Sequence, residues 1–327
     1  MESLVDALRA IAEPTRLRIV VALGQCELTV GDLCRVLNQS QPRVSRHLKV
    51  LTDAGVLERH AQGTSAFFRP ARMTDGREVL DALLPLIPGD DPVIARDRER
   101  LGAIRAERAQ AAANYFAEIA ADWDRMRDLH VADVTVERAM LDAVGDLAVR
   151  DLLDVGTGTG RVLEVFADRI ERGVGIDNSR SMLDVARSRL DEQRLRHCTV
   201  RQGDVYDLPL AAGSFDVAVL HHVLHFLDDP AEAIEQVAST IRAGGRLVIV
   251  DFAPHGYESM RVDYAHHWLG FADDEVIDWC RAAGFVDVSV RHMRPRRTAG
   301  SEPLVTTMWT ATQRADAPSL HPLKAVS

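Results

Sequence analysis

The stretch Asp151-Leu-Leu-Asp-Val-Gly-Thr-Gly-Thr-Gly160 decides the fold of the larger part of this chain. An apolar strand, predicted over 151–155, leads directly into a loop with glycine at every second position, and a helical pattern follows around Val162–Ala167. Glycine lets the backbone turn sharply and approach a ligand, and the start of a helix offers free N–H groups. The stretch therefore predicts a binding loop at the end of a first strand.

Strands and helices alternate from about Val149 onward, which is typical of a doubly wound parallel α/β sheet of the Rossmann type. We predict this domain over residues 131–314. Its apolar strands are expected at 151–155, 173–176, 199–201, 217–220 and 246–250, with two further strands at 286–291 and 305–311.

Several polar residues follow these predicted strands. They are Asp177 with Asn178, Asp204 with Val205, and the histidines His221, His222 and His225. Each acid taken singly is explained about equally well as a helix cap or turn carboxylate. An NAD-binding fingerprint would place a glycine at position 161, where this chain has Arg161.

The glycine spacing at 156, 158 and 160, together with the acids after the next two strands, resembles class I S-adenosylmethionine-dependent methyltransferases over roughly residues 110–313. The resemblance implies that the loop glycines and Asp154 hold the methionine moiety and that Asp177 accepts the ribose hydroxyls. It also implies that Asp204 and Val205 bind the adenine and that His221 lines the pocket near the sulfonium. The cofactor residues so predicted are Asp154, Gly156, Gly158, Gly160, Asp177, Asn178, Asp204, Val205 and His221.

The sequence leaves open whether methyl transfer is catalysed. Alignment of nucleophile and sulfonium can be sufficient, sometimes with a base. His222 and His225 are the candidate bases, although His225 can equally pack within a helix. The Asn/Asp-Pro-Pro-Tyr/Phe pattern of amino-group methylation and the cysteine trio of arsenite methyltransferases are both missing.

The first 88 residues predict a second domain, an α+β winged helix-turn-helix. Helical patterns over 3–12, 17–23, 30–37 and 42–54 precede two strands at 56–60 and 66–69. Val44, Leu48 and Leu51 mark the core face of the fourth helix. The predicted DNA-contacting residues on that helix and the wing are Gln41, Arg43, Ser45, Arg46, His47, Lys49, Arg59 and Arg69.

Residues 40–57 closely resemble the ArsR/SmtB family of bacterial repressors. The resemblance implies binding to double-stranded operator DNA as a homodimer that pairs through helices 3–12 and 74–87. Many members sense metals through a Cys-x-Cys pair on the third helix, where this chain has Thr29 and Gly31. We therefore expect no metal in this domain or elsewhere.

The charge distribution agrees with this division of the chain. The net charge is −10, but residues 1–72 carry ten Lys/Arg against seven Asp/Glu, which confines the positive charge to the first domain. Between the domains we expect a helical connector over 89–130, and after them a flexible tail over 315–327. The absence of a membrane span or signal peptide and the four scattered cysteines favour a cytoplasmic protein.

Two hypotheses follow. In the first, the protein is a transcriptional regulator, expected to be a repressor, whose second domain binds S-adenosylmethionine or S-adenosylhomocysteine as an effector. This order of domains resembles S-adenosylhomocysteine-responsive regulators. In the second, the protein is an active methyltransferase of a small molecule, and its DNA-binding domain controls its own gene.

Overall fold

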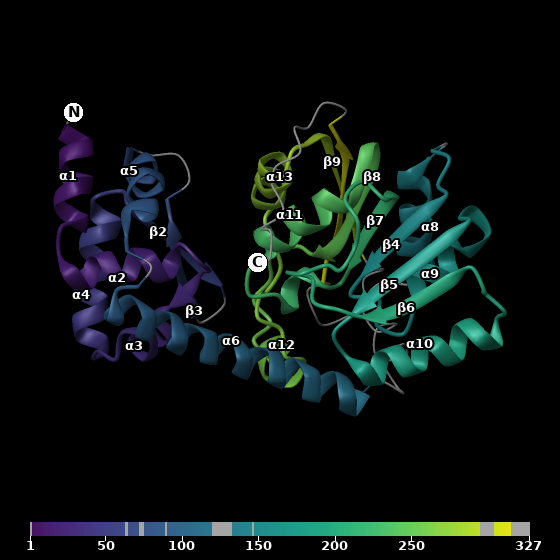
Figure 1. The fold of residues 1–327 in the computed structure, drawn as a ribbon, viewed down its shortest axis with the longest axis horizontal. Helices are drawn as coiled ribbons and strands as arrows, with labels where there is room; N and C mark the ends of the chain where they lie inside the picture. Colours follow the sequence, from purple (N-terminus) through teal and green to yellow (C-terminus); the bar gives the residue numbers. More distant parts are fainter. Residues whose placement is uncertain are drawn as a thin grey trace. The chain divides into compact units, whose positions relative to one another are not determined.

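The computed structural model describes residues 2–62, 65–71, 75–88, 90–119, 133–145, 147–294 and 304–314 (Figure 1). These residues form two compact units. The first comprises Met1–Ala112 and Gly256–His267, and the second comprises Ala113–His255 and Trp268–Ser327. The predicted tail, 315–327, and the predicted connector after residue 119 lie outside the described residues. Within the described ranges, no helix combines the length and apolar character that crossing a bilayer requires.

The first unit has the predicted winged helix-turn-helix order. Its elements are α1 (Glu2–Ile11), α2 (Pro14–Leu23), β1 (Leu28–Thr29), α3 (Val30–Leu37), α4 (Gln41–Asp53), β2 (Leu57–Gln62), β3 (Ser65–Pro70) and α5 (Asp75–Leu83), followed by a 3₁₀ turn (Leu84–Leu86). The strands form an antiparallel sheet in the order β1-β3-β2. Strand β1 was not predicted, because a strand of two residues is too short to show an alternation of apolar and polar side chains.

Local capping fixes the ends of α3. Thr29 Oγ1 accepts a hydrogen bond from the Asp32 backbone N–H at 3.2 Å, and Asp32 Oδ2 accepts one from the Thr29 backbone N–H at 3.1 Å. This capping box satisfies two N–H groups that the helix start leaves without helical partners. Asn38, in the left-handed conformation, ends the helix. Thr29 therefore has a structural role at the position where a metal-sensing relative would carry a thiolate.

The long helix α6 (Pro92–Ile119) extends the first unit beyond residue 88, the predicted boundary. Its residues Ile94, Leu101 and Ile104 are at most 5% exposed. Leu101 and Ile104 join the hydrophobic core cluster of this unit. The first part of the predicted connector is thus built into the first unit.

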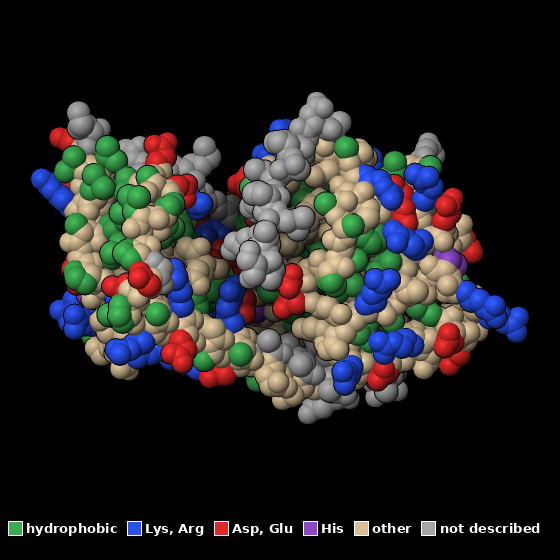
Figure 2. All heavy atoms as spheres, in the orientation of Figure 1, with side chains coloured by type: hydrophobic (Ala, Val, Ile, Leu, Met, Phe, Trp, Pro, Cys, Tyr) green, Lys and Arg blue, Asp and Glu red, His purple; other side chains and the backbone are tan. Residues whose placement is uncertain are grey.

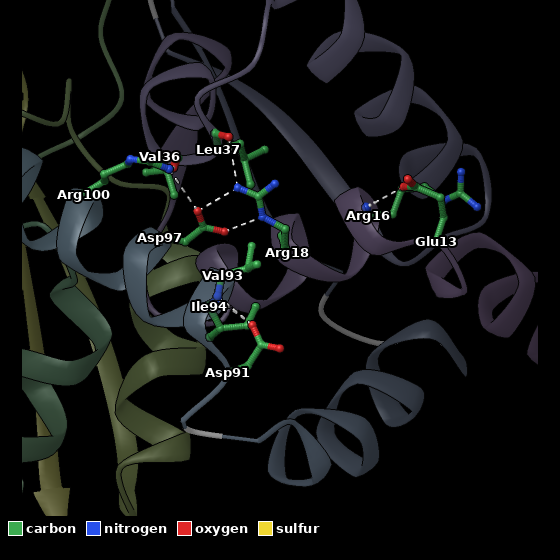
Figure 3. Close-up of polar contacts among 10 residues, drawn as sticks. All are labelled: Glu13, Arg16, Arg18, Val36, Leu37, Asp91, Val93, Ile94, Asp97 and Arg100. Carbon is green, nitrogen blue, oxygen red and sulfur yellow. Dashed lines mark hydrogen bonds and ion pairs between the residues drawn. The ribbon is translucent and has the colours of Figure 1, made fainter.

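A buried ion pair fixes α6 to α2 (Figure 3). Arg18 Nε donates to Asp97 Oδ2 at 2.6 Å, and Arg18 Nη2 donates to Asp97 Oδ1 at 2.7 Å. The same guanidinium donates to the Leu37 carbonyl at 3.0 Å, and Arg100 donates to the Val36 carbonyl at 3.2 Å. Because the last carbonyls of a helix lack helical partners, they are free to accept these bonds: the Arg100 bond attaches α6 to the end of α3, and the Arg18 bond attaches α2 to it.

The second unit contains a sheet of seven strands with helices on both faces (Figure 1). Its strands are β4 (Asp151–Val155), β5 (Arg172–Asp177), β6 (Cys198–Gln202), β7 (Phe215–His221), β8 (Ile241–Phe252), β9 (Phe285–Met293) and β10 (Thr306–Gln313). Its main helices are α8 (Asp133–Val144), α9 (Arg161–Phe166), α10 (Arg180–Glu192), α11 (Pro230–Thr240) and α13 (Asp273–Ala282). In sequence, α12 (Ser259–Asp263) falls between β8 and α13, but it belongs to the first unit.

The order of strands marks the edge of this sheet at which a ligand is expected to bind. The order is β6-β5-β4-β7-β8-β10-β9, and every strand is parallel to its neighbours except β10, which is antiparallel to both β8 and β9. The chain runs outward from β4 to β6 and then returns to the other side of β4 with β7. Ligands of such sheets bind outside the carboxyl ends of the strands at this switch point.

Four charged side chains join the opposite ends of β4, β5, β7 and β8. Arg242 donates to Asp216 at 2.6 Å and to Asp151 at 2.7 Å, and Arg172 donates to Asp151 at 2.6 Å. Although burial raises the pKa of each carboxyl, the hydrogen bonds that both accept lower the pKa of Asp151 and of Asp216 below its ordinary value. We call these four residues the Arg242 cluster.

Candidate DNA-binding and cofactor sites

Helix α4 presents one polar face and one buried face, as predicted. Val44, Leu48 and Leu51 are at most 1% exposed, and their spacing of four and three residues places them on one side of the helix. The helix begins after Ser40, and Pro42 in its first turn needs no intrahelical N–H partner. The buried stripe therefore fixes which side chains point away from the core.

The predicted DNA-contacting residues divide into two groups in the structure. Gln41, Arg43, Ser45, Arg46, Lys49 and Arg59 are exposed. Their contacts are local: Arg46 Nε donates to the Pro42 carbonyl at 3.2 Å, and Lys49 pairs with Asp53 at 3.0 Å. Exposed pairs of this kind contribute less than about 1 kcal/mol, so a phosphate or base can displace them.

His47 and Arg69 point toward carboxylates of their own unit. His47 Nδ1 lies 3.5 Å from Glu13 Oε2, and burial lowers the pKa of this histidine. Arg69 donates to Glu58 at 2.5 Å and to Glu27 at 2.9 Å, and its side chain is 15% exposed. The partners in all three contacts are at least 11 positions apart in sequence, so helical periodicity could not indicate them. The wing turn at residues 63–64 lies outside the described residues.

The glycine loop of the second unit has the backbone shape that its composition predicts. Gly156, Gly158 and Gly160 all have positive φ, at 69°, 51° and 82°. A Cβ on Gly156 would lie 2.4 Å from Val223 Cγ2, so only glycine fits there. This contact brings the residues after β7 against the glycine loop.

Asp177 lies at the carboxyl end of β5 and faces the same loop. Its Oδ2 accepts a hydrogen bond from the Gly158 N–H and its Oδ1 accepts one from the Ser179 N–H, both at 2.8 Å. Burial raises the pKa of Asp177, an effect that these N–H groups oppose. The carboxylate is thus already oriented toward the loop that is expected to hold the cofactor.

Asp154 is 1% exposed and accepts a hydrogen bond from the Thr157 hydroxyl at 2.6 Å. The Asp154 carboxylate therefore fixes the glycine loop through this hydrogen bond to Thr157, a residue of the loop. Asp204, by contrast, is exposed beyond β6 and accepts from the Tyr206 N–H at 3.0 Å. Asn178 is exposed and Val205 half-buried, and both lie beyond their strands as predicted.

A group of histidines lies at the carboxyl end of β7 beside a buried acid at the end of β8. His225 Nδ1 lies 2.7 Å from Asp251 Oδ1, and the two side chains are 2% and 0% exposed. The ring centroids of His221 and His222 are 4.7 Å apart, and those of His222 and His225 are 6.1 Å apart. Burial raises the pKa of Asp251 to about 6, although the charge of His222 acts in the opposite direction.

His222 and His225 were predicted from the sequence as candidate bases, whereas Asp251 was not predicted as a site residue. The sequence does contain a signal for Asp251: it is an acid within the apolar run Leu247–Phe252, where an ionised carboxylate requires a partner. His225, Asp251 and His222 form the one group of three within the described ranges that could hold a metal ion, with ligand atoms within 4.8 Å of one another.

Comparison with known families identifies a domain in each unit. Residues 13–59 match the family described as bacterial regulatory protein, arsR family. Residues 153–249 match the family described as methyltransferase domain. The two matches cover the helix-turn-helix and the sheet from β4 into β8, as the two resemblances in the sequence indicated.

Individual relatives match parts of the chain. An uncharacterized 37.1 kDa protein in transposon TN4556 of Streptomyces fradiae is 36% identical over 128 residues, which is 38% of this chain and 36% of that protein. The demethylmenaquinone methyltransferase of Renibacterium salmoninarum is 28% identical over 165 residues, which is 50% of this chain and 68% of that enzyme. The chain thus spans about a third of the first relative's length.

Among solved structures, a methyltransferase of Thermotoga maritima, described as a possible histamine N-methyltransferase, has a TM-score of 0.49 and 23% identity. The similarity covers 62% of this chain and all of that one.

Proposed function

For a chain that carries an arsR-family helix-turn-helix domain and a methyltransferase domain, we propose the function of a DNA-binding repressor whose methyltransferase domain binds an effector. The effector is S-adenosylmethionine or S-adenosylhomocysteine, and the protein acts on operator DNA in the cytoplasm. The observation that carries this proposal is the exposed basic face of α4, in the same chain as a glycine loop that an acid of the next strand already faces.

The proposed DNA surface is the outer face of α4. Arg43 and Arg46 lie in its first half with Gln41, where side chains of a recognition helix reach base edges. Lys49 and Arg59 are suited to phosphates. We leave His47 and Arg69 out of this surface, because carboxylates of the unit already hold both side chains.

The proposed homodimer uses α1 and α5. Leu4 and Leu8 of α1 are 40% and 48% exposed, and Leu86, just after α5, is 76% exposed. Figure 2 shows hydrophobic side chains gathered on the face of the first unit that carries α1 and α5. Such a patch on a soluble unit favours a protein interface. A twofold dimer would present two α4 helices to half-sites about 34–36 Å apart.

The contacts of α6 suggest how an effector could change DNA binding. An effector acts only if it binds the DNA-competent and DNA-incompetent states unequally. Helix α6 is fixed to α2 and to the end of α3, and α3 directly precedes the recognition helix. A ligand that alters the position of α6 would therefore act on the helix-turn-helix through these contacts.

One observation favours a second candidate function, that of an active methyltransferase of a small molecule. His222 and His225 lie beyond β7, and Val223 between them packs on Gly156 of the glycine loop. Side chains that follow β7 are placed to line the binding site of a methyl acceptor beside the proposed cofactor site. The demethylmenaquinone methyltransferase among the relatives indicates a ring compound as one class of acceptor to test.

Fluorescence anisotropy tests the regulator directly. Labelled DNA from upstream of the protein's own gene is titrated with the full-length chain, alone and with saturating S-adenosylmethionine or S-adenosylhomocysteine. We expect one ligand to change the Kd for DNA by at least about 5-fold, the lower end of typical allosteric coupling. Specific binding that neither ligand alters would contradict the effector role and leave the methyltransferase as the better explanation.

A further inference from the structure

We propose that His222, His225 and Asp251 form a binding site for one divalent metal ion of the zinc type. The proposal does not depend on the regulator function, because the three residues belong to the second unit alone. Two imidazoles and one carboxylate suit Zn²⁺, Co²⁺ and Fe²⁺, and three protein ligands leave a coordination position open for an exogenous ligand.

The geometry of the three groups is close to that of a metal site. Their ligand atoms all lie within 4.8 Å of one another. Two tetrahedral ligands bound to one ion at about 2.0–2.1 Å are separated by roughly 3.3 Å. The 2.7 Å between His225 Nδ1 and Asp251 Oδ1 would therefore widen by about 0.6 Å on binding a tetrahedral ion. The ion would replace the proton that these two atoms share, and that proton would pass to solvent.

Backbone hydrogen bonds and a neighbouring ring hold the ligand side chains in place. Asp251 Oδ1 accepts a hydrogen bond from the Phe252 N–H at 2.8 Å, and Asp251 Oδ2 accepts one from the His225 N–H at 3.3 Å. The ring of Phe252 lies 4.5 Å from the ring of His222 and 5.3 Å from the ring of His225. Because such supporting contacts orient the ligands in advance, binding requires little reorganisation.

The backbone at His222 supplies a separate argument. This residue has φ at +57°, a left-handed conformation that is uncommon for residues other than glycine. With this backbone conformation, a ligand atom of His222 lies within 4.8 Å of those of His225 and Asp251. Backbone strain of this kind persists where the surroundings enforce it, and it concentrates at functional sites.

The location defines the class of ligand that could occupy the open position. His222 directly follows β7, and Val223 contacts Gly156 of the glycine loop. An ion in the triad would therefore lie beside the proposed cofactor site. Small molecules with a hydroxyl or carbonyl oxygen are the ligands we assign to the open position, since oxygen donors coordinate these ions readily.

Cobalt titration tests the site without reference to activity. The chelator-treated full-length protein is titrated with Co²⁺ and followed by the visible ligand-field absorption, and Zn²⁺ binding is measured by calorimetry. We expect one ion per chain, with His222→Ala and Asp251→Asn each lowering the affinity at least about 10-fold. His197→Ala is the matched control, because His197 is a half-buried histidine of the same unit that contacts the Ala167 carbonyl.

Circular dichroism establishes that each variant is folded, and His222→Ala is the decisive variant because this side chain is only partly buried. The proposal is overturned if wild-type protein binds no Co²⁺, or if His222→Ala binds it as tightly as His197→Ala does. S-adenosylhomocysteine titration in the absence of metal is measured in parallel. If the wild-type protein binds S-adenosylhomocysteine but no Co²⁺, the metal site is refuted and the proposed function stands.

Discussion

Replacement of Asp97 by alanine provides a quantitative test of how α6 is attached. The carboxylate is 5% exposed and makes two hydrogen bonds to Arg18, whose side chain is 17% exposed. Removal of one partner of a buried ion pair typically costs about 3–5 kcal/mol. Because Arg18 keeps its bond to the Leu37 carbonyl, we expect the lower end, about 3 kcal/mol, which for a unit of this size lowers Tm by roughly 10 °C.

The distribution of tryptophan allows the two units to be followed separately. The three tryptophans within the described residues, Trp268, Trp279 and Trp309, belong to the second unit, so their fluorescence reports that unit, whereas circular dichroism at 222 nm also reports the helices of the first. Asp97→Ala should therefore lower the transition seen by circular dichroism and leave the fluorescence transition unchanged.

The matched control is Glu107→Ala on the same helix. Glu107 pairs with Arg35 at 2.6 Å, but the two side chains are 61% and 53% exposed. Its loss should change stability by less than about 1 kcal/mol. Equal destabilisation by Asp97→Ala and Glu107→Ala would refute the reasoning that burial, and not the number of ion pairs, determines the attachment of α6.

Four further predictions follow from the remaining sites. Arg46→Ala should abolish specific DNA binding in the anisotropy assay and leave adenosyl-ligand affinity unchanged; wild-type DNA affinity in this variant would remove α4 from the interface. Asp177→Ala should weaken S-adenosylhomocysteine binding in calorimetry by about 1.5–3 kcal/mol, the range of hydrogen bonds to a charged group, and an unchanged titration would contradict the ribose assignment. Leu8→Glu should shift the chain toward monomer in sedimentation equilibrium because it places a charge in the proposed apolar interface, and an unaltered dimer would place the interface elsewhere. Arg242→Gln should destabilise the second unit at neutral pH, as measured by urea unfolding followed by tryptophan fluorescence; because the cluster's carboxyls have lowered pKa values, the difference from wild type should shrink below about pH 4, and a pH-independent difference would argue against the charge pairing.

Local chemistry made much of the fold readable from the sequence. The predicted span of α3 is the observed one, Val30–Leu37, and β4 occupies its predicted residues, Asp151–Val155. The start of α3 is specified by a capping box four residues long, and β4 by an apolar run that ends in glycine. The buried stripe of α4 likewise needs only the period of 3.6 residues, which the sequence displays directly.

The tertiary structure decided how separate segments meet. Asp251 lies beside His225 because β7 and β8 are neighbours in the sheet, and two residues 26 positions apart in sequence give no local signal of that pairing. Arg69 belongs to a cluster of charges within its unit because strand pairing places it opposite Glu58. Caps and periodicity act within a few residues, so the sequence by itself determined the elements, the two domains and the residues at their ends. Packing and strand order act across the whole unit, and they determined which of those residues are available to a ligand.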